Sequence, residues 1–198
     1  MSTQKRLSTN ISTLTECSVM LALSFALSYA KLFEMPMGGS VTVASMLPIM
    51  LISIKYGVGT GLTTGFLYSL TQLMQAFISA NVFPYCQTPK ALALCILFDY
   101  LLPFTLLGLA GLVKQLEITK KAEVNAYIGI TLAVMLRFIC HFITGVVIWG
   151  QWAPDGMGKY LYSFLYNGGF LSLDFIICIV CAVLLFRKSE IKRLVNME

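Results

Sequence analysis

The chain has 198 residues, of which 58% are hydrophobic and only 12% are charged. A soluble domain is usually about one quarter charged, and a chain of this size could not bury so much apolar surface in one core. The composition therefore excludes an ordinary soluble protein. It indicates an all-α membrane protein in which residues 1–198 form a single integral-membrane domain.

The net charge of +5 does not indicate a nucleic-acid partner, because no basic patch with interleaved exposed aromatic residues is present. We attribute the charge to Lys and Arg residues in loops that set the orientation in the membrane. Residues 1–14 are polar, and we expect them to form a short cytoplasmic tail. A polar stretch of this kind before the first apolar run argues against a cleaved signal peptide.

Charged residues and Gly/Pro clusters divide the rest of the chain into six predicted helical spans. They cover about residues 15–33, 41–55, 58–80, 89–114, 123–149 and 159–187. The second span contains Pro48 and is shorter than the roughly 20 residues that a straight crossing requires, so we expect it to be bent or partly interfacial. The sequence thus predicts a bundle of six transmembrane helices.

The distribution of Lys and Arg between the spans predicts the orientation of this bundle. If both termini are cytoplasmic, the outer side holds only Lys90 and Lys159, with Lys31 near that side. The inner side then holds the ten residues Lys5, Arg6, Lys55, Lys114, Lys120, Lys121, Arg187, Lys188, Lys192 and Arg193. We therefore expect a multi-pass protein of the cell membrane with both termini inside.

No motif of an enzyme is present. The segment GMGK at 156–159 is not a phosphate-binding loop, because Ala153 replaces the first Gly and Tyr160 follows the Lys. There is no HExxH, no GxSxG and only one His. The six cysteines lie mostly within apolar runs, as packing residues do. We expect neither catalysis nor a cofactor.

Four ionisable residues fall within the apolar spans: Asp99, Arg137, His141 and Asp174. Each costs about 2.5–3.5 kcal/mol at the bilayer centre on insertion scales, so such groups are usually paired or functional. Arg137 and His141 are four residues apart and share one helix face. For Arg137 we expect a structural ion pair with Asp99 or Asp174. For His141 both a core position and a binding role stay open.

A polar aromatic stretch, GQWAPDGMGKYLYSFLYNGG at residues 150–169, follows the fifth span. If it converges with the intramembrane polar residues, a carboxylate among aromatic faces would suit a flat organic cation. Asn and His would add directional hydrogen bonds. The candidates are Asp99, Tyr100, His141, Trp149, Trp152, Tyr162, Tyr166 and Asn167. The alternative is an aromatic belt at the membrane interface, which would explain Trp152 and Tyr160 but not Asp99, His141 or Asn167.

The first span carries a stripe of small residues in the segment LALSFALSYA. Ala22, Ala26 and Ala30 repeat every four residues, and Ser24 and Ser28 repeat the same step on another face. Such stripes allow close approach of helices in lipid. The stripe could pack inside the bundle or form a docking face for a separate membrane subunit.

Several segments together resemble one known family. They are MPMGGSVTVASMLPIM, KYGVGTGLTTGFLYSLTQL, LFDYLLPFTLLGLAGL and RFICHFITGVVIWGQWAPDGMGKYLYSFLYNGG. The chain resembles, over nearly its whole length, the thiamine-specific substrate-binding subunits (S-components) of energy-coupling factor transporters, the ThiT or YuaJ family. The last segment is the most specific, because its His, Trp, Tyr and Asn keep the spacing of the family.

The resemblance implies roles for individual residues. Asp99 would hold the pyrimidine side of thiamine or balance its charge, Tyr100 would line the pocket, and Trp149 would stack on the ligand. His141, Tyr162 and Asn167 would form hydrogen bonds with it. Ala22, Ala26 and Ala30 would dock the partner. Some family members carry a second Trp after the first span, where this chain has Met-Gly-Gly-Ser. Tyr85 or Trp152 would then supply the second ring that stacks on the ligand, or this chain would have no such ring.

The resemblance also implies a function and partners. The chain would be the substrate-capture subunit of a vitamin uptake transporter, without catalytic residues or metal. It would bind thiamine on the extracellular side and contact membrane lipid. It would work with a transmembrane coupling subunit and two ATPase subunits. The alternatives are a stand-alone transporter of small organic cations and an intramembrane enzyme, and the latter lacks a nucleophile and a metal-ligand set.

Overall fold

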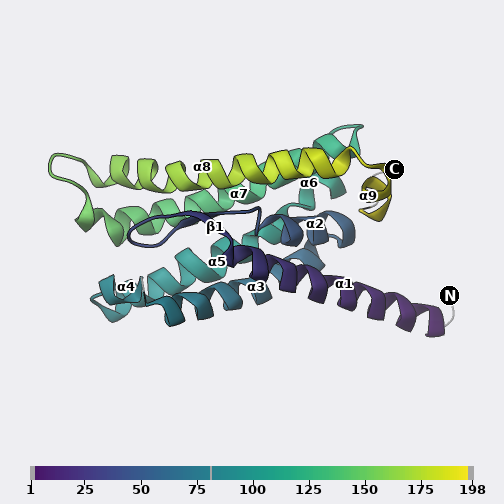
Figure 1. Ribbon diagram of the computed structural model, residues 1–198, viewed down its shortest axis with the longest axis horizontal. Helices are drawn as coiled ribbons and strands as arrows, with labels where there is room; N and C mark the ends of the chain where they lie inside the picture. Colours follow the sequence, from purple (N-terminus) through teal and green to yellow (C-terminus); the bar gives the residue numbers. More distant parts are fainter. Residues whose placement is uncertain (1–2, 81, 196–198) are drawn as a thin grey trace.

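The protein is described by a computed structural model over residues 3–80 and 82–195, and it is largely helical (Figure 1). The helices are α1 Thr3–Tyr29, α2 Leu47–Tyr56, α3 Val58–Ser79, α4 Pro89–Cys95, α5 Leu102–Thr105, α6 Leu112–Gln115, α7 Ala122–Val147, α8 Lys159–Phe186 and α9 Ser189–Leu194. A π-helical turn covers Ile96–Leu101, and 3-10 segments lie at Phe83–Tyr85, Leu106–Leu109 and Trp149–Trp152. Strands β1 (Lys31–Glu34) and β2 (Ser40–Thr42) form an antiparallel hairpin.

Length and apolar composition mark four helical segments of the described residues as candidate membrane spans. They are Asn10–Tyr29, Pro89–Gln115, Ala122–Val147 and Lys159–Phe186. They correspond to the first, fourth, fifth and sixth predicted spans, which supports a helical, multi-pass membrane protein. The other two predicted spans correspond to α3, with 22 residues, and α2, with 10.

The second predicted span is wrong in its extent. Residues 40–42 form β2, and the helix begins only at Leu47. The ten-residue α2 is apolar because it lies in the core: every residue from Leu47 to Ile54 is buried. A short apolar run is compatible with a membrane span and with a buried helix alike, and in this structure α2 is enclosed by the other elements of the bundle.

The chain between α1 and α2 also differs from the prediction. The first predicted span ends at residue 33, but α1 ends at Tyr29 and a β-hairpin follows. The turn of this hairpin contains Gly38 and Gly39, whose φ angles of 89° and 83° are unfavourable for other residues. The expectation of an all-α chain is therefore wrong at this point. The predicted polar tail is helical from Thr3 onward.

The fourth predicted span is not one regular helix. Within it, α4 passes into the π-helical turn Ile96–Leu101, and α5 follows with Pro103 in its first turn. Proline has no amide hydrogen and its ring crowds the carbonyl four residues earlier, which here belongs to Asp99. The break in the regular helix therefore lies at an ionisable residue, and π turns are often found at functional sites.

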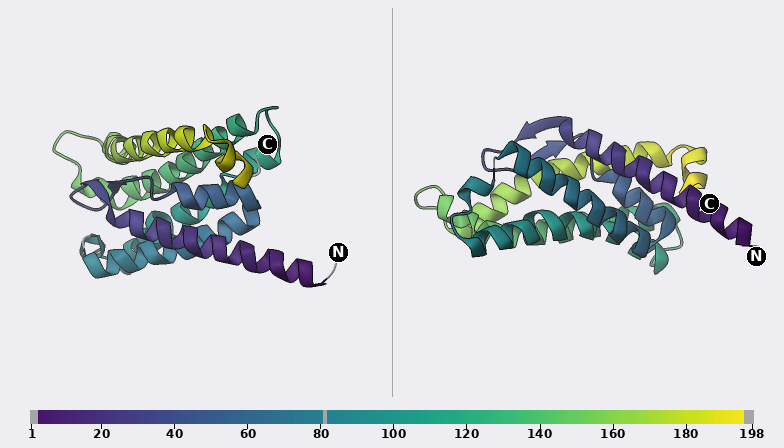
Figure 2. Two further views of the ribbon diagram at one scale, coloured as in Figure 1. Left: turned by 45° about the vertical axis from the view of Figure 1, so that its right-hand side comes forward. Right: turned by 90° about the horizontal axis from the view of Figure 1, so that it is seen from below.

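The helices form an elongated bundle in which α7 and α8 pack along one another (Figures 1 and 2). Both termini lie at the same end, and the loop between α7 and α8 lies at the opposite end (Figure 1). The terminal end contains the ion pairs Lys55–Glu16 and Lys192–Glu123. There Lys114 also donates to the carbonyl oxygens of Ile54 and Val195, at 3.1 and 2.9 Å.

Candidate ligand-binding cavity

A cavity of about 240 Å³ lies among the hairpin, α3, the π turn, α7 and α8, with the end of α1 at its margin. It is lined by all six residues that the sequence predicts to bind substrate, namely Asp99, Tyr100, His141, Trp149, Tyr162 and Asn167. These residues come from three separate parts of the chain. Their convergence is the arrangement that the aromatic-belt interpretation does not explain.

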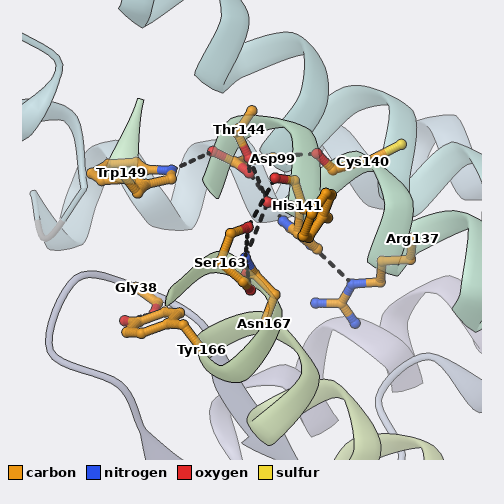
Figure 3. A network of polar contacts seen from close by, with 11 residues as sticks. Gly38, Asp99, Arg137, Cys140, His141, Thr144, Trp149, Ser163, Tyr166 and Asn167 are labelled. Atoms are coloured by element: carbon orange, nitrogen blue, oxygen red, sulfur yellow. Dashed lines mark hydrogen bonds and ion pairs between the residues drawn. The ribbon is translucent and has the colours of Figure 1, made fainter. Parts of the chain in front are cut away.

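Asp99 is the centre of the polar contacts in the cavity (Figure 3). Its Oδ1 is 3.0 Å from His141 Nδ1 and also accepts a hydrogen bond from the Thr144 hydroxyl. Its Oδ2 accepts a hydrogen bond from Trp149 Nε1 at 3.1 Å. The π turn changes the helical register at this position, so that Asp99 and its neighbour Tyr100 both line the cavity.

Arg137 and His141 lie on one face of α7, as their spacing predicts. Arg137 Nε donates to His141 Nε2 at 3.3 Å, and its Nη1 lies 3.4 Å from Asp174 Oδ2. The guanidinium also lies over the ring of Phe104, 4.6 Å from its centroid. The expected ion pair of Arg137 is confirmed, and its partner is Asp174 rather than Asp99. All of these residues line the cavity.

Asn167 is held where α8 packs closely against α7 at Gly145. Its Nδ2 donates to the His141 carbonyl oxygen at 3.1 Å, and to the carbonyl and hydroxyl oxygens of Ser163 at 3.1 and 3.3 Å. Gly145 permits this approach, because a Cβ atom there would lie 2.1 Å from Ser163 Oγ. The amide nitrogen of Asn167 thus bonds within the protein, and the residue lines the cavity.

Tyr166 connects α8 to the hairpin turn over the cavity. Its hydroxyl accepts a hydrogen bond from the Met37 amide at 3.2 Å and donates one to the Gly38 carbonyl at 2.9 Å. Its ring lies 5.6 Å from that of Tyr162, centroid to centroid. The hairpin therefore forms one wall of the cavity and is fixed by Tyr166, a residue of the polar aromatic stretch.

Two aromatic residues that the sequence offers as replacements for the second Trp do not line the cavity. Tyr85 and Trp152 pack edge to face against each other, with ring centroids 5.5 Å apart. The additional aromatic walls come instead from Tyr166, which the aromatic stretch suggested, and from Phe170 and Phe104.

A polar part of the cavity wall, on α1 and α3, was not predicted from the sequence. Gln72, Gln75 and Ser28 line the cavity, and Gln75 Nε2 donates to Ser28 Oγ at 2.7 Å. The available signal was the pair of Gln residues within a predicted membrane span, where polar side chains usually face the interior of the bundle.

The alanine stripe on α1, with Ala30 just after the last residue of the helix, faces outward. Ala22, Ala26 and Ala30 are exposed, whereas Ser24 and Ser28 on the other face are 0% and 3% exposed. The stripe is therefore not packed inside this chain. Within residues 3–80 and 82–195, no group of three or more His, Cys, Asp or Glu side chains is placed to hold a metal ion.

Comparison with known proteins finds one family over most of the chain. The family described as "Thiamine transporter protein (Thia_YuaJ)" matches residues 14–194. "Thiamine transporter ThiT" of Bacillus subtilis strain 168 is 35% identical over 182 residues, which cover 87% of this chain and 89% of that protein. The protein of the same name from Lacticaseibacillus paracasei strain ATCC 334 is 27% identical over 177 residues, 83% of this chain and 82% of the relative.

A solved structure of ThiT from Listeria monocytogenes has the same fold, with a TM-score of 0.69 and 23% identity. The similarity covers 92% of this chain and 98% of that chain. The family match extends over most of the chain, and the identity to the B. subtilis protein covers nearly the full length of both. The chain therefore belongs to the ThiT (YuaJ) family of thiamine transporter proteins.

Proposed function

We propose that the protein is the substrate-capture subunit of a thiamine uptake transporter and that thiamine binds in the cavity around Asp99. The observation that carries the proposal is the convergence of the Asp99 carboxylate, the His141 and Asn167 side chains and several aromatic rings on a single cavity. The names of the relatives, which are thiamine transporters, point to the same ligand. Transport, rather than catalysis, is the role of the family.

The chemical groups of thiamine are complementary to the residues that line the cavity. Its thiazolium ring is a flat cation, which is attracted to the faces of Trp149 and Tyr162 and to the carboxylate of Asp99. Its aminopyrimidine ring carries hydrogen-bond donors and acceptors along one edge. The Asn167 oxygen can accept a hydrogen bond from this edge. The His141 ring, whose two nitrogens contact Asp99 and Arg137, and Tyr100 can pack beside the ligand.

We propose that six helices cross the membrane, with both termini in the cytoplasm and the cavity open to the outside. Two observations support this orientation. The N- and C-termini lie at one end together with Lys55, Lys114 and Lys192, as cytoplasmic basic residues would. The ligand-lining residues Trp149 and Tyr162 border the α7–α8 loop at the opposite end.

The chain carries no phosphate-binding loop, so energy for uptake would have to come from a partner. We propose that a transmembrane coupling subunit and two ATPase subunits supply it, and that the exposed stripe Ala22, Ala26 and Ala30 docks the coupling subunit. Membrane lipid would cover the other apolar faces. Small residues suit such a docking face because they let two helix backbones approach closely in lipid.

Titration of the purified protein with thiamine tests ligand binding, with quenching of tryptophan fluorescence as the signal. Trp149 lies in the cavity wall, so we expect saturable quenching. A second experiment separates the proposal from a stand-alone transporter of organic cations. The protein is reconstituted alone in liposomes and thiamine uptake is measured. Uptake by the protein alone would support the alternative, whereas uptake only with ATPase-bearing subunits supports the proposal.

A further inference from the structure

The charges that line the cavity do not cancel. Among the described lining residues, two side chains are cationic and three are anionic, namely Lys31, Arg137, Glu34, Asp99 and Asp174. Lys31 and Glu34 pair with each other at the margin, at 2.8 Å. Arg137 pairs with Asp174. One negative charge is left, and it belongs to Asp99.

The state of His141 follows from its contact with Arg137. A guanidinium has only hydrogen-bond donors, so His141 Nε2, at 3.3 Å from Arg137 Nε, must be the acceptor. The ring proton is therefore on Nδ1, which donates to Asp99 Oδ1 at 3.0 Å. This imidazole is neutral. Arg137 thus prevents His141 from becoming a second cation that would neutralise Asp99.

The other hydrogen-bond partners of Asp99 are neutral as well. They are the hydroxyl of Thr144 and the indole of Trp149. Asp99 is 9% exposed and Arg137 is 6% exposed, so water screens neither charge well. A carboxylate in this setting keeps its full attraction for a cation that enters the cavity.

Asp174 neutralises the positive charge of Arg137. It is 1% exposed, and its Oδ1 accepts hydrogen bonds from the amide and hydroxyl of Thr42 in β2, at 3.0 and 3.1 Å. Its Oδ2 faces Arg137. The Arg137–Asp174 pair therefore connects α7 and α8 to the hairpin, and its two charges cancel.

We propose that Arg137 and Asp174 set the charge selectivity of the cavity. Arg137 is a positioning residue that keeps His141 neutral, and Asp174 cancels the charge of Arg137. The cavity then presents one net negative charge, which selects a ligand with one positive charge over a neutral ligand of the same shape. This inference rests on the proposed function for the identity of the ligand, and it concerns residues that need not touch that ligand.

The test compares thiamine with 3-deazathiamine, a neutral isostere in which carbon replaces the thiazolium nitrogen. The measured quantity is the ratio of the two dissociation constants, obtained by calorimetry for the wild-type protein and three variants. In Asp174→Asn the charge of Arg137 is unopposed. We expect the preference for thiamine to fall about tenfold or more, the scale of one unit charge nearby at an effective dielectric constant of about 20.

The double variant Arg137→Gln/Asp174→Asn distinguishes charge from structure. It removes both members of the pair and leaves the net charge of the cavity unchanged. The amide of the introduced Gln can still donate a hydrogen bond to His141 Nε2 and so keep the imidazole neutral. We therefore expect the preference for thiamine to return to within about threefold of the wild-type value, since the sum of the charges is restored. Asp155→Asn, an exposed change in the α7–α8 loop, is the matched control and should leave the ratio unaltered.

An unchanged ratio in a folded Asp174→Asn protein would overturn the inference. The inference would also be overturned if the double variant prefers thiamine no more strongly than Asp174→Asn does and has a normal unfolding temperature. The pair would then be only structural. If the wild-type protein binds neither compound, the proposed function itself fails. The two failures are therefore distinguishable.

Discussion

Trp149 and Asp99 are joined by a hydrogen bond from the indole Nε1 to Oδ2, 3.1 Å long. The largest aromatic face of the cavity and its unpaired charge are therefore held together as one unit. Trp149 lies in a 3-10 segment just after α7, and Asp99 lies in the π turn after α4. Two departures from the regular α-helix thus place the two groups that suit a flat cation.

Removal of the Trp149 ring tests this arrangement. In Trp149→Ala the ligand loses an aromatic face and Asp99 loses a hydrogen bond. We expect thiamine to bind more weakly by about 1–3 kcal/mol, roughly 5- to 150-fold. Isothermal titration calorimetry measures the change.

The chain offers its own control for this variant. Trp152 lies three residues further on and packs against Tyr85 outside the cavity. Trp152→Ala should therefore bind thiamine within about threefold of the wild-type affinity. Equal losses for both tryptophans would show that Trp149 acts through general packing and not through the ligand.

The close approach of α7 and α8 at Gly145 gives a second prediction. A methyl group there would meet Ser163 Oγ at 2.1 Å and Asn167 Nδ2 at 2.7 Å. Gly145→Ala should therefore destabilise the fold by about 1–3 kcal/mol, as other overpacked sites do, and should weaken binding through Asn167. Thermal unfolding in detergent, with and without thiamine, checks both effects.

Gly169 is the matched control for Gly145. It also lies in a helix, but no atom would come within 4 Å of an added Cβ. Gly169→Ala should keep the unfolding temperature or raise it slightly, because alanine favours the helix over glycine by about 0.5–1 kcal/mol. If Gly145→Ala behaves in the same way as Gly169→Ala, the proposed role of the helix crossing is wrong.

The exposed stripe on α1 leads to a third prediction. Ala26→Trp adds a large ring to a face that is not packed inside the chain. The isolated protein should fold and bind thiamine normally, because lipid can make room for the ring. Co-purification with the coupling subunit and thiamine uptake should both be lost, since the ring blocks close helix contact.

Val180→Trp provides the comparison for the stripe, because Val180 is 51% exposed on α8 and belongs to no small-residue stripe. This variant should assemble and transport normally. Loss of thiamine binding by isolated Ala26→Trp would mean that the stripe is needed for the fold, and assembly of this variant at the wild-type level would show that the stripe is not the docking face.

Much of the cavity could be predicted from the sequence, because an ionisable residue in an apolar segment requires a partner or a ligand. Asp99, His141 and Asn167 stand out on this ground, and the structure brings them together. The ion-pair partner of Arg137, in contrast, could not be predicted from the sequence. Asp99 and Asp174 were equally plausible, and the choice depends on how α7, α8 and the hairpin pack.

The irregular parts of the backbone were predicted less well from the sequence than the residues of the cavity. The segment after α1 is apolar enough to extend a helix, but Gly38 and Gly39 favour a turn and the chain forms a hairpin. Pro103 signalled a break in the fourth span, although not that the break would be a π turn at Asp99. The buried position of α2 is a tertiary property that hydropathy alone does not reveal.

The affinity of Asp99→Asn for thiamine tests the central claim most directly. The change removes one charge and hardly alters the volume, so the fold should be kept, as a normal unfolding temperature would confirm. Calorimetry on the purified protein should show that thiamine binds at least about tenfold more weakly than to the wild-type protein and to Asp155→Asn, which is the scale expected for a buried charge pair. Binding to Asp99→Asn as tight as to the wild type would contradict the account, because the cavity would then hold thiamine without using its unpaired carboxylate.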